Sequence, residues 1–325
     1  MNKHKLLVSV SFHGGLSAHY HNLIKGMGSE KNARHHAVAT AYGEALVHGA
    51  PHPEGFTILR EINRGGMAVV YLARQLNPVR EVALKVMLPR YVDNQEVRAC
   101  FQIEAQAMAT LEHARVMPVY QTGEWNGLSF IAMKLAVGGT LEDYLKKHRP
   151  TIKQTVMWLA AVGEAVHFLH RRGVLHRDLK PGNLLFDAKG DIFVGDFGVA
   201  HITNARNIAS WRVDALVGTP HYLAPEIASR SAQGASVAAD NYSLGAVLYE
   251  CLTGQCPFDG NDDLPSLLKN IAKNELPCVR ELRPETPEYL AAVCAKAMAK
   301  NPEDRHESVQ QFVEDLRRMD QSGIE

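Results

Sequence analysis

The sequence lacks an excess of charge of either sign. Its 325 residues include 35 lysines and arginines and 35 aspartates and glutamates, so the formal net charge is zero. Proteins that hold nucleic acid or anionic membranes by bulk electrostatics carry a basic excess. We therefore expect no nucleic-acid partner.

Long apolar runs are also missing. No stretch of about 18 apolar residues occurs, so no membrane-spanning helix is expected. The most apolar segment, residues 156–169, contains Gly163, Glu164 and His167, which is typical of a buried helix. Near the start, the apolar run in "MNKHKLLVSVSFHGG" is broken by serines and His13, so we expect no signal peptide.

Cysteines are few, odd in number and scattered, and no C-x-x-C motif occurs. This pattern predicts reduced thiols in a cytoplasmic protein rather than disulfides or a zinc site. The five are Cys100, Cys251, Cys256, Cys278 and Cys294.

Histidines are concentrated at the N-terminus, where the first 52 residues hold half of the 16. Pairs such as His35-His36 suggest metal binding, but no fixed ligand set accompanies them. We interpret residues 1–54 as a poorly ordered extension, or as the product of a start codon upstream of the native one. Pro51 and Pro53 mark a linker to the rest of the chain.

The remaining chain changes character along its length. Residues 56–134 contain short β-branched runs, such as "FTILREI", "AVVYLAR" and "EVALKVM", and one helical segment at 98–113. Beyond residue 134 long helical patterns dominate, including 155–173 and 236–254, each ended by glycine. This order predicts a small β-rich lobe with one helix, followed by a larger α-helical lobe.

Residues 174–186, "VLHRDLKPGNLLF", carry the most chemical information. Between two apolar runs stand a carboxylate, a cation and an amide, namely Asp178, Lys180 and Asn183. Thirteen residues after Asn183 comes Asp196, in "VGDFGVA". Each short motif is weak alone, but the eight-residue string 176–183 followed by D-F-G is specific.

The chain resembles the eukaryotic-like (Hanks-type) serine/threonine protein kinases of bacteria. The signature motifs V-A-L-K at 82–85, H-R-D-L-K-P-G-N at 176–183, D-F-G at 196–198 and A-P-E at 224–226 occur in the family's order. The resemblance implies an α+β bilobal kinase fold over residues 55–318. The N-lobe would span 55–134, the C-lobe 135–318, and residues 319–325 would form a tail.

The resemblance implies transfer of the γ-phosphoryl group of Mg-ATP, with Mn²⁺ as a substitute, to protein substrates. Phosphoryl transfer depends on positioning and charge neutralisation. Asp178 matches the position that accepts the substrate hydroxyl proton, and Lys180 the cation that neutralises the transferred group. Asn183 and Asp196 match the two metal-binding positions, because hard oxygen ligands suit Mg²⁺.

Lys85 matches the lysine that binds the α- and β-phosphates. Its expected partner is Glu104, 19 residues later on the predicted helix, with Glu112 as the alternative.

The segment 131–139 matches the strand and hinge beside adenine, with Met133 as gatekeeper and the backbone of Lys134 and Ala136 as hydrogen-bonding groups. Many relatives carry Glu at the Lys134 position, and we expect that exchange to matter little. The resemblance places Val70, Ala83 and Leu185 around the adenine ring.

The glycine-rich loop departs from the family pattern. G-x-G-x-x-G-x-V would place glycines at 63, 65 and 68, but the chain has Asn63, Gly65 and Ala68. Ile62, Asn63, Gly65 and Gly66 are the expected loop contacts to ATP. If each replacement strains the loop by about 1 kcal/mol, binding weakens by roughly 30-fold at most.

Other positions match structural roles in the family. Asp240 would bond the catalytic-loop backbone, and Arg305 would pair with Glu226. Thr219, which would brace Asp178 and Lys180, favours serine/threonine specificity. The loop 196–226 has few hydroxyl residues, which argues against activation by its phosphorylation, and Asp214 is a candidate for a constant negative charge in its place.

The sequence is compatible with three functions. They are an active protein kinase, a pseudokinase that binds ATP or acts as a scaffold, and a small-molecule kinase with the same fold. The complete set of Lys85, Glu104, Asp178, Asn183 and Asp196 favours the first. The segment from G-T-P to A-P-E resembles a protein-substrate site and disfavours the third. The protein substrate and the oligomeric state are not indicated.

Overall fold

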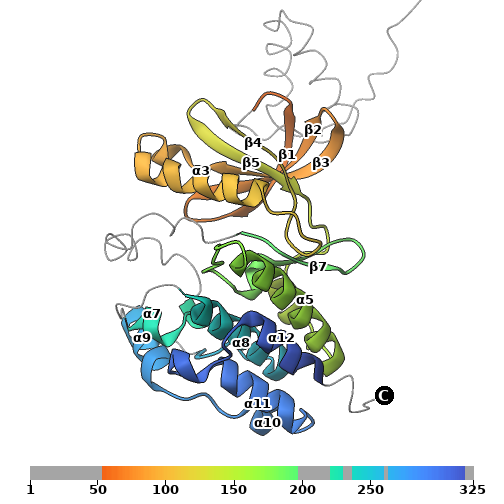
Figure 1. Ribbon diagram of the computed structural model, residues 1–325. Helices are drawn as coiled ribbons and strands as arrows, with labels where there is room; N and C mark the ends of the chain where they lie inside the picture. Colours follow the sequence, from red (N-terminus) through yellow and green to blue (C-terminus); the bar gives the residue numbers. More distant parts are fainter. Residues whose placement is uncertain (1–52, 197–219, 230–235, 260–262, 319–325) are drawn as a thin grey trace, which may run out of the picture.

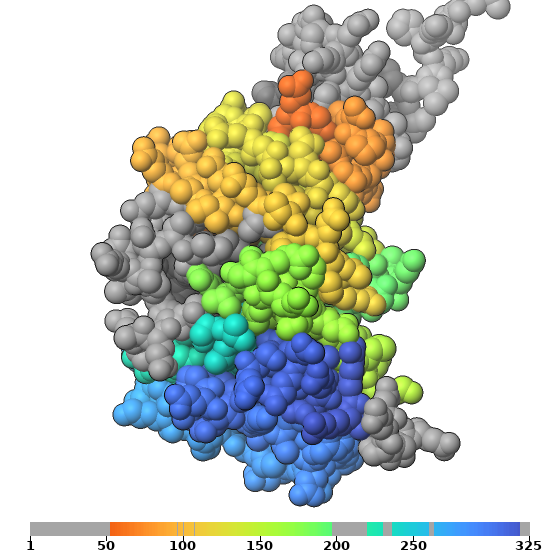
Figure 2. All heavy atoms as spheres, in the orientation of Figure 1, coloured from red at the N-terminus to blue at the C-terminus, as the bar shows by residue number. Residues whose placement is uncertain are grey.

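The computed structural model describes residues 53–196, 220–229, 236–259 and 263–318. The predictions for the His-rich extension, for the tail and for Thr219 and the loop around it lie outside these residues. The described chain forms two lobes, an upper one of strands and one long helix and a lower one of helices (Figures 1 and 2). The predicted α+β bilobal fold is confirmed.

The small lobe is built on one antiparallel sheet of five strands with the order β1-β2-β3-β5-β4. Its strands are β1 (Phe56–Arg64), β2 (Ala68–Leu76), β3 (Val79–Met87), β4 (Val119–Trp125) and β5 (Leu128–Lys134). β2 pairs with β3 so that Val70 lies opposite Lys85, and β3 pairs with β5 so that Ala83 lies opposite Met133. This register places the candidate nucleotide-binding residues of β2, β3 and β5 side by side.

Helix α3 (Gln95–Ala109) packs on the sheet beside β4 and β5. Its buried face carries Val97, Phe101, Ala105 and Met108, which recur at helical spacing. Buried Glu104 lies on the same helix, where an apolar residue would be expected. The helix begins three residues earlier than predicted. Asn94 explains this, because its Oδ1 accepts the Val97 amide at 3.1 Å, as in an N-cap.

The large lobe is centred on α8 (Val237–Thr253), which is buried along most of its length. Ser236 caps its start, and Gly254 ends it in the left-handed conformation with φ 75°. α5 (Ile152–His170) and the other helices surround it (Figure 1). The remaining helices are α4 (Leu141–Leu145), α7 (Pro225–Ala228), α9 (Leu264–Lys273), α10 (Val279–Leu282), α11 (Glu288–Ala297) and α12 (Val309–Arg317). Single 3₁₀ turns are η1 (Pro89–Tyr91), η2 (Pro181–Asn183), η4 (Pro220–Tyr222) and η5 (Pro302–Asp304).

A short hairpin, β6 (Leu184–Phe186) and β7 (Ile192–Val194), lies between the lobes (Figure 1). Ile192 and Val194 belong to the core of the large lobe, whereas Phe193 belongs to the core of the small lobe. Strand side chains alternate between faces, so three residues contact both cores. No helix of the described chain is long and apolar enough to cross a bilayer.

Candidate active site

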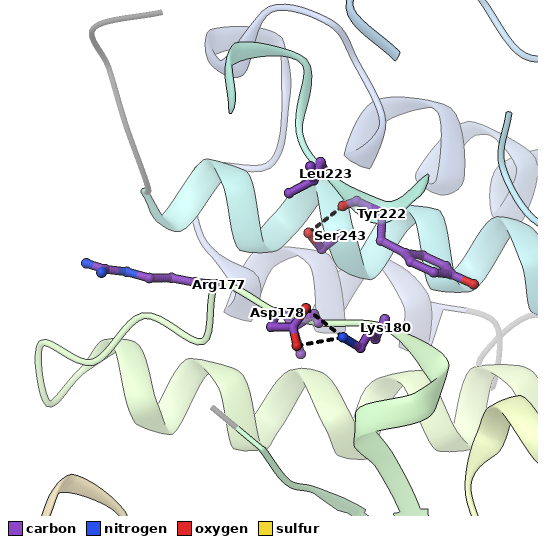
Figure 3. Close-up of a pocket in the computed structure, with 7 residues that line it drawn as sticks. Arg177, Asp178, Lys180, Tyr222, Leu223 and Ser243 are labelled. Carbon is purple, nitrogen blue, oxygen red and sulfur yellow. Dashed lines mark hydrogen bonds and ion pairs between the residues drawn. The ribbon is translucent and has the colours of Figure 1, made fainter. Parts of the chain in front are cut away.

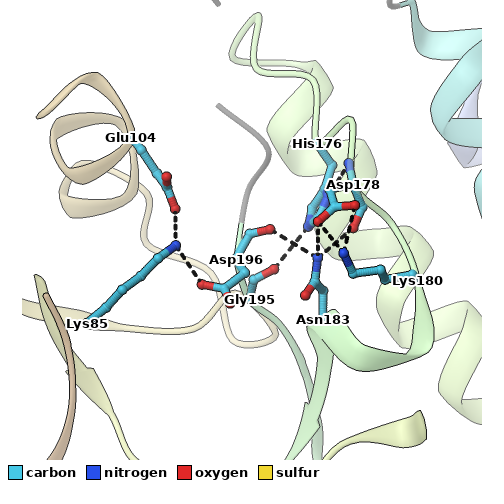
Figure 4. Close-up of polar contacts among 8 residues, drawn as sticks. All are labelled: Lys85, Glu104, His176, Asp178, Lys180, Asn183, Gly195 and Asp196. Carbon is cyan, nitrogen blue, oxygen red and sulfur yellow. Dashed lines mark hydrogen bonds and ion pairs between the residues drawn. The ribbon is translucent and has the colours of Figure 1, made fainter. Parts of the chain in front are cut away.

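The catalytic-loop carboxylate predicted from the sequence is surrounded by donors. Lys180 Nζ donates to both oxygens of Asp178, at 3.0 Å and 2.7 Å. Asn183 Nδ2 donates to Asp178 Oδ2 at 2.8 Å and to the Asp178 carbonyl at 2.7 Å (Figure 4). The Asp178 side chain nevertheless stays 45% exposed, so a substrate hydroxyl can reach it.

A buried carboxylate on α8 holds this loop in place. The two oxygens of Asp240 accept the backbone N–H of His176 at 2.9 Å and of Arg177 at 2.8 Å, and the His170 ring lies 2.7 Å away. Burial raises the pKa of Asp240, but these donors outweigh it and lower the pKa. Arg177 has φ 67°, an unfavourable value for a non-glycine residue, and the bond from its amide helps to maintain it. The predicted contact of Asp240 with the H-R-D backbone is thereby confirmed.

His176 connects the catalytic loop to the residues just before the D-F-G motif. Its Nδ1 lies 3.3 Å from the Asp178 amide and its Nε2 lies 3.1 Å from the Gly195 carbonyl. The amide can only donate and the carbonyl only accept, so the proton resides on Nε2. The next residue, Asp196, has φ 42°, a second left-handed position. Arg177 and Asp196, the two residues with positive φ, therefore lie at the two ends of the hydrogen bonds made by His176.

Lys85 lies between two carboxylates (Figure 4). Its Nζ is 2.8 Å from Glu104 Oε1 and 3.0 Å from Asp196 Oδ1, so the predicted partner Glu104, not Glu112, is present. Burial lowers the pKa of Lys85, but the charges of Asp196 and Glu104 outweigh it and raise the pKa. The Lys85 charge in turn lowers the pKa of Asp196. The lysine is therefore fixed as a cation between α3 and the start of the D-F-G motif.

The donor set around Asn183 and Asp196 fits a divalent metal. The amide nitrogen of Asn183 is directed at Asp178, which leaves its amide oxygen for another ligand. The Asp196 side chain is 39% exposed. In the described residues no group of three or more His, Cys, Asp or Glu side chains gathers as a metal site. One carboxylate and one amide oxygen suit a cation, such as Mg²⁺, that is also bound by phosphates.

We call residues 134–139 the hinge. The residues expected around adenine lie together in or against the core of the small lobe, next to the hinge. Ala83 and Met133 are buried in that core, and Val70, Ala136 and Leu185 pack against it. Gly195 lets Leu185 approach closely, since a Cβ on Gly195 would lie 2.6 Å from Leu185 Cδ1. The Lys134 amide donates to the Pro118 carbonyl at 2.9 Å, so only its carbonyl is available to adenine.

The glycine-rich loop does not show the expected strain. Ile62 and Asn63 belong to β1 and Ala68 to β2, and neither Asn63 nor Ala68 has a positive φ. The turn is closed by the Gly65 amide, which donates to the Ala68 carbonyl at 2.8 Å. The part of that strain that a left-handed backbone would cause is therefore absent, because strand conformations suit both residues. Gly66 is braced from its side by Arg90, which donates to its carbonyl.

A small pocket opens beside Asp178 and faces the segment that precedes A-P-E (Figure 3). Tyr222 and Leu223 form one wall, and Ser243 of α8 donates to the Tyr222 carbonyl at 2.8 Å. The Tyr222 hydroxyl donates to Glu250 Oε2 at 2.5 Å. The other lining residues are Arg177, Leu179 and Lys180. The pocket thus lies between the catalytic loop and the segment that precedes A-P-E.

The A-P-E glutamate is bound as predicted. Arg305 donates to both oxygens of Glu226, at 2.9 Å and 2.7 Å, and both side chains are almost fully buried. Arg305 also donates to the backbone carbonyls of Ala238 and Ala299. This bidentate pair ties the A-P-E segment to the end of α11 and the start of α8.

The sequence did not reveal the contacts of three residues that support the site. His176 begins the string 176–183 and His170 lies six residues before it, but nothing in the sequence says that the His170 ring reaches Asp240 or that the His176 ring reaches Gly195. Tyr222 stands four residues before Glu226, and nothing nearby in the sequence indicates that its hydroxyl bonds Glu250. In each case the partner is distant in the chain, which a local pattern does not reveal.

Residues 56–322 match the family model described as a protein kinase domain. The match covers most of the chain, so the chain belongs to the protein kinase family. Family membership implies use of ATP and a divalent cation. The order of motifs, the bilobal fold and the network of Figure 4 agree with it.

Curated relatives are bacterial serine/threonine protein kinases, which confirms the resemblance seen in the sequence. Serine/threonine-protein kinase PrkC of Bacillus subtilis is 34% identical over 263 residues, which is 81% of this chain and 40% of that protein. Serine/threonine-protein kinase PknB of Mycolicibacterium smegmatis is 36% identical over 262 residues, or 78% and 41%. The chain therefore spans about two fifths of the length of these relatives.

Among solved structures, the PknI kinase domain of Mycobacterium tuberculosis superposes with a TM-score of 0.64 at 26% identity. The superposition covers 84% of this chain and 99% of that chain.

Proposed function

We propose that this chain is a serine/threonine protein kinase that transfers the γ-phosphoryl group of Mg-ATP to hydroxyl groups of protein substrates, with Mn²⁺ as a substitute for Mg²⁺. The observation that carries the proposal is the position of Asp178. This carboxylate is exposed, oriented by Lys180 and Asn183, and connected through the Asn183 and Gly195 contacts to Asp196 and Lys85.

In the proposed reaction a serine or threonine oxygen forms a bond to the γ-phosphorus, and the bond from that phosphorus to the bridging oxygen of ADP breaks. The hydroxyl proton passes to Asp178. Lys180 neutralises charge on the transferred group, and Lys85 binds the α- and β-phosphates while Glu104 orients it. Asn183 and Asp196 would hold the cation, which screens the phosphate charges.

The residues of the adenine pocket support ATP as the donor. Val70, Ala83 and Leu185 would contact the two faces of the ring, next to gatekeeper Met133. The Lys134 carbonyl and the Ala136 backbone would bond its edge. Ile62, Asn63, Gly65 and Gly66 would cover the nucleotide from the β1–β2 turn.

The pocket of Figure 3 supports a protein substrate, since one wall is the segment that precedes A-P-E. Lys180 two residues after Asp178, together with Thr219, favours serine and threonine over tyrosine. The dependence on ATP supports a cytoplasmic location for this domain.

The test is transfer of radiolabelled phosphate from Mg-ATP to a general protein substrate, with phosphoamino-acid analysis of the product. We expect labelled serine and threonine with the wild type. Asp178→Asn should reduce the rate by about 10²- to 10⁴-fold, the range for loss of a positioned general base. Nucleotide binding should persist in that variant, because Asp178 lies outside the adenine pocket.

Two results would contradict the proposal. Equal labelling by wild type and Asp178→Asn would point to a contaminating activity. Nucleotide binding without any transfer by the wild type would make the chain a pseudokinase, the alternative kept from the sequence.

A further inference from the structure

Lys134 ends β5, and its side chain crosses from the small lobe to the β6–β7 hairpin. Its Nζ donates to Asp187 Oδ2 at 3.0 Å and lies 3.9 Å from the centroid of the Phe193 ring. The exposed fractions of the two charged side chains are 29% for Lys134 and 14% for Asp187. A partly buried pair of this kind is screened less by water and salt than a surface pair.

Asp187 is fixed in position to receive this lysine. Its Oδ1 accepts the backbone amides of Lys189 at 2.9 Å and Asp191 at 3.1 Å, which closes the turn between β6 and β7. Its other oxygen remains for Lys134. Burial raises the pKa of Asp187, but Lys134 and the two amides outweigh it and lower the pKa, so the carboxylate is charged at neutral pH.

The hairpin also carries the lower surface of the adenine pocket. Leu185 lies in β6, between the hinge-facing backbone of Phe186 and the metal-binding Asn183. Beyond the adenine position, the hinge is bonded to β6 by backbone alone. The Gly138 amide donates to the Phe186 carbonyl at 2.8 Å, and the Phe186 amide donates to the Gly139 carbonyl at 2.9 Å.

The backbone atoms that would bond adenine, on Lys134 and Ala136, therefore lie between two attachments. One is the backbone pairing at residues 138–139, and the other is the Lys134 side chain. Without the second, the end of β5 keeps the chain itself, the apolar contacts of Phe193 and an indirect backbone link, in which the Lys134 amide bonds Pro118 and the Met117 amide bonds Val194 of β7. The distance between the hinge and Leu185 would then vary more.

We propose that Lys134 is a positioning residue for the nucleotide: its side chain, bound to Asp187 and Phe193, sets the spacing between the hinge and Leu185. The inference rests on the proposed function, of which it specifies one part. It replaces the expectation that the residue type at 134 matters little, because that expectation considered the backbone only.

The direct test is the affinity of Lys134→Met for adenosine and for Mg-ADP, measured by calorimetry. Methionine keeps the length of the side chain and removes the charge. We expect both dissociation constants to rise by about three- to tenfold, the loss of one partly buried ion pair with a cation–π contact. The KM for ATP should rise by the same factor, with a much smaller change in kcat. Lys134→Arg should restore the affinity, since arginine can pair with Asp187 and stack on Phe193.

A double-mutant cycle separates this pair from a general loss of packing. Asp187→Asn keeps an oxygen for the two turn amides and loses the charge. If the pair acts as a unit, Lys134→Met combined with Asp187→Asn should bind no more weakly than the weaker single variant. Arg317→Met is the matched control, because it breaks an ion pair with Glu164 between α12 and α5, away from hinge and hairpin. It should bind nucleotide as the wild type does.

The outcomes distinguish this inference from the proposed function. Unchanged affinity in both Lys134→Met and Asp187→Asn, in an enzyme whose wild type transfers phosphate, would overturn the inference alone. Weakened nucleotide binding in those variants, with no transfer by the wild type, would support the inference and overturn the kinase activity. Additive losses in the cycle would also overturn the inference.

Discussion

Gly65 has room for a side chain as far as the protein alone is concerned. A Cβ at this residue would meet only the Ala68 carbonyl, at 3.6 Å, and Gly65 does not have a positive φ. We infer that the space is kept for phosphate. Gly65→Ala should leave the melting temperature unchanged or slightly higher. It should weaken binding of a non-hydrolysable ATP analogue by about fivefold, if displacing the loop costs on the order of 1 kcal/mol.

Adenosine is the control ligand for Gly65→Ala, because it lacks phosphates and should bind to the variant and the wild type equally. A parallel loss of adenosine affinity would show that the methyl group disturbs the loop itself.

Asn63 and Ala68 lead to a different prediction at the same scale. Both lie in strands with ordinary backbone conformations. The double change Asn63→Gly and Ala68→Gly should therefore fail to tighten ATP binding. It should lower the free energy of unfolding by at most about 2 kcal/mol, since glycine in a strand interior costs roughly 0.5 to 1 kcal/mol per residue and these two residues lie near strand ends. Denaturant unfolding and calorimetry check the two parts, and tighter binding would restore the strain argument.

At the scale of elements, α8 controls the catalytic loop through one carboxylate. Asp240→Asn replaces one acceptor oxygen with a donor that faces the loop amides, so one bond is lost and Arg177 loses part of its support. We expect kcat to fall by about 10- to 100-fold, equivalent to about 1.4 to 2.7 kcal/mol. The dissociation constant of Mg-ADP should change little, because Asp240 bonds the backbone of His176 and Arg177 and none of the residues expected to bind nucleotide.

The measurement for Asp240→Asn is steady-state kinetics beside nucleotide calorimetry on one preparation. An equal loss in both would instead indicate that the large lobe is unfolded, and thermal melting identifies that case.

The elements also show which parts of the structure could be predicted from the sequence. The residue types in the string 176–183 indicate a catalytic loop without further information. The position of Glu104 on the helix after Lys85 predicted their ion pair correctly. The positive φ angles of Arg177 and Asp196 could not be predicted, because they depend on Asp240 and on the His176 contact with Gly195. Nor could the Lys134–Asp187 pair, whose members are 53 residues apart. Long-range contacts override local preferences at such positions.

At the scale of the whole molecule, buried histidines predict an acid-sensitive fold. Burial lowers the pKa of His176, and it lowers the pKa of His306 to about 4. Since both values lie below the unfolded value of about 6.5, the unfolded chain takes up protons first as the pH falls. Stability is therefore fully present above pH 6.5 and lost toward pH 4, by roughly 3 kcal/mol for His306.

Denaturant titrations at several pH values between 7 and 4.5 test this dependence. The His306→Leu variant cannot titrate at this position, so its stability should fall less steeply with acid than that of the wild type. Identical slopes would exclude His306 as a source of the dependence.

The division of β7 between two cores has a consequence for how the lobes move. Phe193 packs in the small lobe, while its neighbours Ile192 and Val194 pack in the large one. A rotation of one lobe relative to the other must therefore turn about this strand, because sliding would expose apolar surface on both sides at once. The axis of opening and closing thus passes close to Leu185, so that the part of the pocket nearest adenine would move least and the β1–β2 turn farthest.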